Sequence, residues 1–148
     1  MSLKVNMKPT SVIKANLGIQ PGGAVHKYFT KRCADHMDKY VPFYNGTLAY
    51  DTRTIETDKI VYNAPYAHYM YEGKVMGPNI PIKEDGIIVG WFSKGPKYYT
   101  NKNIKYKPSA GHEYAGPYWD QRMWSAEKNA IIQEVQDYIN TRGGKWCK

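Results

Sequence analysis

The 148-residue chain has the length of one domain with a hydrophobic core of its own, and its composition excludes disorder over most of the sequence. Aromatic residues make up 14% of the chain, whereas disordered segments are poor in aromatics. No apolar run approaches the roughly 20 residues that span a bilayer, and we expect no signal peptide. Two cysteines, Cys33 and Cys147, are too few for a disulfide framework, so we expect a protein that stays in a reducing compartment.

The formal net charge of +8 is concentrated in two blocks of the sequence. Residues 1–40 carry seven basic and two acidic side chains, and residues 94–112 carry five lysines and no acid. Residues 41–93 between them are slightly acidic. Lysine dominates both blocks, whereas base reading favours arginine. The charge therefore predicts a solvated or partner-facing surface ahead of sequence-specific DNA binding.

The sequence predicts an amphipathic helix over residues 24–40. Its apolar positions recur at steps of three and four residues, and Pro42 stops it. Residues 1–20 before it have no clean period, although residues 5–7 could begin a strand and residues 13–17 could dock as a short turn.

The middle of the chain predicts β-structure broken by turns. Asn45-Gly46 is a turn signal, and alternating apolar residues suggest a strand between Leu48 and Ile55. A short strand is expected over residues 59–62, followed by a short helix through residues 66–71 that Gly73 stops. Further strand candidates are residues 75–76, 87–91 and 104–106, and residues 94–103 form either a loop or the arms of a long hairpin.

A second helix is predicted from Gly116-Pro117 to Thr141, with Gly143-Gly144 as its C-terminal cap. The order of elements predicts an α+β fold. A single domain over residues 1–148 would have an antiparallel twisted sheet packed against an N-terminal helix and a long C-terminal helix. Its core would cover about residues 24–141, with residues 1–20 and 143–148 peripheral.

Few residues have the spacing that a catalytic or metal-binding site requires. His68 and Glu72 have a spacing that could hold a divalent metal, but the pattern offers no third ligand. Cys33 and His36 lie one helical turn apart, yet Cys33 falls within the apolar stripe of its helix, where a thiol packs as a small hydrophobe. The common catalytic motifs are missing. The sequence therefore predicts a protein that is not an enzyme, with no catalytic residues, no metal and no cofactor.

The chain has 14 tyrosines, which are too many for one small core. Tyrosine is enriched at protein interfaces, can build the core of a sheet, and can stack on single-stranded nucleic acid. These three interpretations stay open at this point. Because lysines form a block after residue 93 and tyrosines can anchor an interface, we expect an interface that includes Lys94, Lys97, Tyr98, Tyr99 and Lys102.

Two segments of the sequence resemble segments of a known protein family. The first, residues 60–73, predicts a strand and a short helix; the second, residues 110–123, leads into the last helix. Together with Gly46-Thr47-Leu48 they resemble the minor capsid or tail-completion family of long-tailed bacteriophages and prophages over about residues 24–139. The residues that carry the match are Tyr62, Pro65, Tyr66, Ala67, Glu72, Gly73, Trp119, Arg122 and Met123.

The resemblance implies a small α+β structural protein of the virion neck, present in the host cytoplasm during assembly. It implies a ring of copies between head-closure or connector proteins and tail-terminator proteins, without catalytic residues, cofactor or membrane. Non-specific contact with DNA in the channel is compatible with such a ring. The alternative hypothesis is a nucleic-acid-binding module that uses its lysines and tyrosines.

Overall fold

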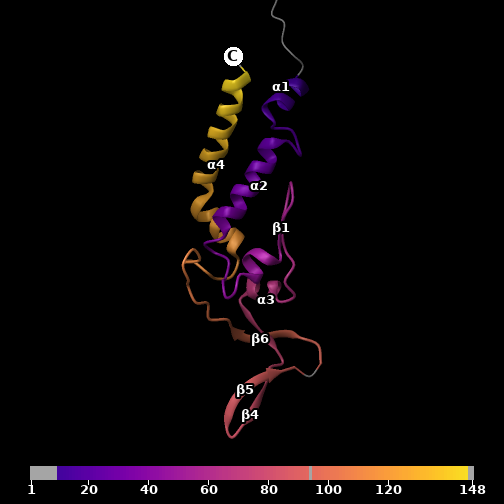
Figure 1. Cartoon of the computed structure of the whole chain (residues 1–148), viewed down its shortest axis with the longest axis vertical. Helices are drawn as coiled ribbons and strands as arrows, with labels where there is room; N and C mark the ends of the chain where they lie inside the picture. Colours follow the sequence, from indigo (N-terminus) through magenta and orange to yellow (C-terminus); the bar gives the residue numbers. More distant parts are fainter. Residues whose placement is uncertain (1–9, 94, 147–148) are drawn as a thin grey trace, which may run out of the picture. The chain divides into compact units, whose positions relative to one another are not determined.

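A computed structural model describes residues 10–93 and 95–146, and the expected α+β fold is confirmed (Figure 1). The chain forms two compact units. The first comprises the described parts of Met1–His36, Thr54–Val61 and Met123–Lys148; the second comprises Met37–Arg53 and Tyr62–Arg122. None of the described helices has both the length and the apolar character that crossing a membrane requires.

The first unit is built on two long helices. They are α2 (Ala24–Met37) and α4 (Trp119–Trp146), whose ends reach into the second unit. The helices pack antiparallel, since the ring of Tyr28 stacks on that of Tyr138 at 4.2 Å and Arg32 reaches Glu134. The remaining elements are α1 (Thr10–Leu17) and most of the hairpin of β1 (Arg53–Ile55) and β2 (Ile60–Tyr62).

Helix α4 differs from its predicted bounds at both ends. It begins at Trp119 because Tyr118 has a φ of 50°, which the right-handed helix does not allow. It continues past Gly143-Gly144 to Trp146 instead of ending there. Glycine lowers helix stability by only about 1 kcal/mol per residue, so a pair of glycines weakens a long helix without breaking it.

A cluster of charged side chains fastens α2 to α4. Glu134 accepts a hydrogen bond of 2.6 Å from Nε of Arg32 and lies 3.0 Å from Nε2 of His36. The other ring nitrogen of His36 lies 3.3 Å from Glu127. The hydrogen bond from Arg32, followed by that from His36, lowers the pKa of Glu134 to about 2 against the opposing effect of burial.

The second unit contains the remaining strands and short helices. Its core side chains include Tyr40, Val41, Leu48 and Tyr69. The elements are a single π-helical turn, η1 (Thr47–Asp51), the helix α3 (Ala67–Glu72), and the strands β3 (Lys74–Gly77), β4 (Ile80–Glu84), β5 (Ile87–Phe92) and β6 (Tyr98–Asn103).

One predicted strand is wrong, and another is confirmed only at its end, where β1 covers Arg53–Ile55. The segment from Leu48 begins as the helical turn η1, because the carbonyl of Gly46 accepts hydrogen bonds from the N–H groups of Tyr50 and Asp51. Residues 104–106 lie outside the strands, and β6 precedes them. Residues 98–103 form the strand β6. They lie in the segment 94–103, for which the sequence predicted either a loop or the arms of a long hairpin.

The strands of the described residues form three two-stranded sheets, where the sequence predicted one. Strand β3 pairs antiparallel with β6, with Met76 opposite Tyr99. Strand β4 pairs antiparallel with β5 through the turn at Asp85 and Gly86 (Figure 1). Apolar alternation predicts that a strand has a buried face, but it does not say which strand is its neighbour.

The Glu134 cluster makes the free energy of unfolding depend on pH. Since the native pKa lies below the ordinary value, the ionised carboxylate stabilises the fold above about pH 5, and this contribution is lost as pH falls towards about 2. We expect Glu134→Gln to lower the free energy of unfolding near neutral pH and to flatten its acid dependence, as measured by urea titration. Glu56→Gln, at an exposed side chain of the same unit, is the control. An acid dependence equal to that of the unmodified protein would contradict this role.

Candidate functional site

The two sequence segments that carry the family resemblance meet in the second unit. Trp119, only 3% exposed, places its indole ring 5.4 Å from the ring of Tyr62 and 5.1 Å from that of Tyr71. Both tyrosines meet the indole nearly edge-on, at interplanar angles of 66° and 85°. Such edge-to-face contacts add stability beyond the apolar area they bury. A strand, a short helix and the start of α4 are therefore joined by one aromatic cluster.

Hydrogen bonds join the same two segments. The backbone N–H of Tyr118 donates to the carbonyl of Tyr71 at 3.0 Å, and the Tyr71 hydroxyl donates to Asp120 at 2.8 Å. The Tyr118 hydroxyl donates to Glu72 at 3.1 Å, and this bond raises the pKa of Tyr118. These tyrosines act as structural donors, and Glu72 accepts one of their hydrogen bonds.

Gly73 and Arg122 of the resemblance have local structural roles. Gly73 ends α3 with a φ of 74°, and a Cβ added there would lie 3.2 Å from Cβ of Pro117. The Arg122 guanidinium lies over the ring of Tyr40 at 5.6 Å from its centroid. Ala67 and Met123 are buried, Pro65 is exposed, and Tyr66 lines a cavity.

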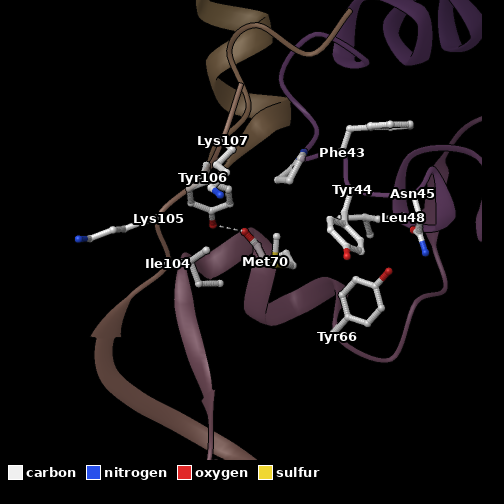
Figure 2. Close-up of a pocket in the computed structure, with 11 residues that line it drawn as sticks. Phe43, Tyr44, Asn45, Leu48, Tyr66, Met70, Ile104, Lys105, Tyr106 and Lys107 are labelled. Carbon is white, nitrogen blue, oxygen red and sulfur yellow. Dashed lines mark hydrogen bonds between the residues drawn. The ribbon is translucent and has the colours of Figure 1, made fainter. Parts of the chain in front are cut away.

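The cavity has a volume of about 310 Å³ and an aromatic lining. Figure 2 shows Tyr44 and Tyr66 on one side and Tyr106 on the other, with the Tyr106 hydroxyl bonded to the carbonyl of Met70. Burial raises the pKa of Tyr106 to about 12, so this hydroxyl stays protonated. The charged residues of the lining are Lys105 and Lys107. The cavity can therefore accept an apolar side chain with an acidic neighbour.

The interface predicted around Lys97 is divided among several contacts. Nζ of Lys97 donates to the carbonyl of Pro78 and to Oδ1 of Asn79, at 3.0 and 2.8 Å. Tyr98 and Tyr99 are about half exposed, although the Tyr99 ring lies 4.9 Å from that of Tyr69. Lys102 lines a second cavity of about 500 Å³ together with Trp91. Lys94 lies outside the described residues. The four described residues of the predicted interface are all exposed, although Lys97 and Tyr99 also make contacts within the chain.

The hairpin of β4 and β5 is the exposed surface that sequence reasoning missed. Its large apolar side chains are 37–68% exposed: Ile80, Ile82, Ile87, Ile88, Val89, Trp91 and Phe92. The sequence did contain a signal for this hairpin, since Asp85-Gly86 separates two segments with apolar residues. In the structure both residues have a positive φ, of 50° and 82°. An Asp-Gly pair of this kind is typical of a two-residue hairpin turn.

Cys33 and His36, which the sequence offered as a possible nucleophile and base, have other surroundings in the structure. Both ring nitrogens of His36 face carboxylates, and burial raises the pKa of Cys33, which disfavours its thiolate. His68 packs against the rings of Tyr69 and Tyr99. Within the described part of the chain, no three His, Cys, Asp or Glu side chains form a group that could hold a metal ion. Cys147 lies outside the described residues.

No protein-family model, curated protein or solved structure matches this chain. The family resemblance therefore rests on the residues given above.

We expect Trp119→Ala to lower the free energy of unfolding by about 3–5 kcal/mol, because it removes a buried ring from between two tyrosines. The measurement is chemical denaturation followed by circular dichroism. Trp124→Ala is the matched control: the same ring is removed from α4 where it is 39% exposed, and the loss should be clearly smaller. Equal losses would show that the indole of Trp119 does not hold the two segments together.

Gly73→Ala tests the close approach of α3 to Pro117. The new Cβ would have a strained backbone at φ 74° and a contact of 3.2 Å. A left-handed backbone alone costs about 1–2 kcal/mol for a residue with a Cβ. Gly86→Ala is the control, since its φ is 82° and its added Cβ would meet nothing within 4 Å. We expect a larger drop in the thermal midpoint at Gly73; a larger drop at Gly86 would contradict the packing argument.

Proposed function

We propose that this chain is a non-catalytic structural subunit of the head–tail junction of a long-tailed bacteriophage or prophage. It would act through contacts with copies of itself and with head-closure, connector or tail-terminator proteins. The observation that carries the proposal is the run of exposed apolar side chains on β4 and β5. Contiguous apolar surface of this kind marks sites of interaction in soluble proteins.

The exposed surface favours protein partners over a small substrate. Trp91 and Phe92 are 61% and 47% exposed, and aromatic side chains of this kind anchor protein interfaces. Several polar groups of the two resembling segments are engaged in hydrogen bonds, including those of Tyr71 and Tyr118 to carboxylates. A scaffold with a hydrophobic hairpin is what a subunit of an assembly needs. The resemblance supports the virion neck as that assembly.

Deleting the coding sequence from its phage or prophage should leave filled heads that carry no tails. Free tails should be absent, overlong or unattached, because the proposed subunit completes the junction rather than either part. Electron microscopy of induced lysates and plaque counts measure the outcome. Supplying the intact protein in trans should restore joined particles, whereas Ile87→Asp/Trp91→Asp should not. A normal yield of infectious particles from the deletion strain would reject the proposal.

A second candidate function, non-specific binding of nucleic acid, is favoured by one observation. Lys102, Lys105 and Lys107 are exposed close in sequence to the half-exposed rings of Tyr98 and Tyr99. Titrating the purified protein with single- and double-stranded DNA at several salt concentrations distinguishes the candidates. Tight binding that weakens steeply with salt would favour this second function.

A further inference from the structure

The tip of the β4–β5 hairpin combines an apolar side chain with two acids. Ile87, which is 68% exposed, stands opposite Glu84 in the strand register, and Asp85 occupies the turn between them. Lys83 pairs with Ile88, so its side chain belongs to the other face of the hairpin. Within the described part of the chain, Glu84 and Asp85 form no ion pair. The tip therefore presents a branched aliphatic group beside two unpaired carboxylates.

The aromatic cavity has the complementary chemistry. Its walls come from rings such as those of Tyr44, Tyr66 and Tyr106, and its charged lining residues are both lysines. Tyr44 is 96% exposed, which leaves its ring available to cover an incoming group. Figure 2 shows the side chain of Lys105 extending outward from the segment that forms one side of the cavity. No ion pair involves Lys105 or Lys107 among the described residues.

We propose that the hairpin tip of one copy of this chain docks into the aromatic cavity of a second copy. Ile87 enters the cavity, and Glu84 and Asp85 meet Lys105 and Lys107 at its rim. The charge complementarity selects a second copy as the occupant, since one chain carries both halves of the contact. This inference rests on the proposed function, in which copies of the chain assemble with one another.

The two halves of this contact are unlike surfaces, so the contact is heterologous. A heterologous contact leaves a free tip at one end of a pair and a free cavity at the other. Further copies can then add in the same way until the assembly closes. The apolar strand face beyond the tip, with Ile82 opposite Gly90 and Ile80 opposite Phe92, extends the surface that docking covers.

Charge reversal tests the contact on the full chain. Glu84→Lys/Asp85→Lys sets four lysines against one another, and Lys105→Glu/Lys107→Glu sets four acids against one another. Each variant alone should self-associate at least about tenfold more weakly in sedimentation velocity, because like charges oppose docking. Mixed in equal amounts, the two variants should assemble again, since every contact between them pairs opposite charges. Lys27→Glu/Lys128→Glu, at exposed sites of the first unit, is the charge-matched control and should assemble normally.

Disulfide trapping identifies the partner surfaces directly. In a chain that carries Cys33→Ser and Cys147→Ser, one sample receives Ile87→Cys and the other Tyr66→Cys. We expect a disulfide-linked dimer on mixing, and little from either sample alone. Crosslinking of Ile87→Cys to itself, or none in the mixture, would overturn the proposal, as would charge-reversed variants that assemble normally.

The outcomes separate this inference from the proposed function. If the variants leave self-association unchanged while deletion of the coding sequence still prevents head–tail joining, only the docking contact is wrong. If deletion has no effect while mixing restores assembly, the contact stands and the phage role is wrong.

Discussion

The second unit depends on one constraint, which is that the indole of Trp119 is held between Tyr62 and Tyr71. The constraint acts on the backbone as well. Tyr118 turns the chain at a φ of 50° immediately before α4 begins, and Gly73 adopts a left-handed conformation where Pro117 comes close. A positive φ is costly for Tyr118 and persists only where packing determines it, whereas Gly73 adopts it without strain and leaves room for Pro117. The buried indole provides this packing, and it does so at the first residue of a long helix. Segments that lie about 50 residues apart in sequence are thereby held as one structural unit.

The sequence predicted the parts whose signals are local. Helix α2, the strand at residues 60–62 and the helix that ends before Gly73 were predicted from periodicity and capping chemistry, and the structure contains them. The resemblance pointed to residues 60–73 and to Trp119, but their aromatic contact depends on tertiary packing and no periodicity reveals it. The turn η1 was missed because alternating apolar residues suit either a strand or an irregular turn when Gly46 begins it at a φ of 87°. The ion cluster around Glu134 was also out of reach, since its members come from two helices more than 90 residues apart.

Several side chains that the sequence singled out as chemical candidates have structural partners. His36, which the sequence placed beside Cys33, is shared between Glu127 and Glu134 and fastens two helices. Tyr71 and Tyr118 donate to carboxylates and join the resembling segments. The large apolar and aromatic side chains of β4 and β5 are 37–68% exposed. A two-stranded hairpin is only marginally stable by itself. A partner that covers the apolar side chains of the hairpin would stabilise the hairpin, and burial of the same side chains would contribute to the affinity of the partner.

The lysine block after residue 93 contributes to several local arrangements instead of one uniform basic surface. Lys97 donates to a backbone carbonyl and to Asn79, and so holds the connection between β3 and β4. Lys102 lies at the cavity that contains Trp91, whereas Lys105 and Lys107 line the aromatic one. A polyanion would require these cations to act together along a single path. One cavity combines Lys102 with Trp91 and the other combines two lysines with several rings, which suits discrete acidic and apolar groups such as those at the hairpin tip of this same chain. The lysines described after Gly95 are thus divided among separate contacts, and this arrangement supports the proposed assembly with proteins.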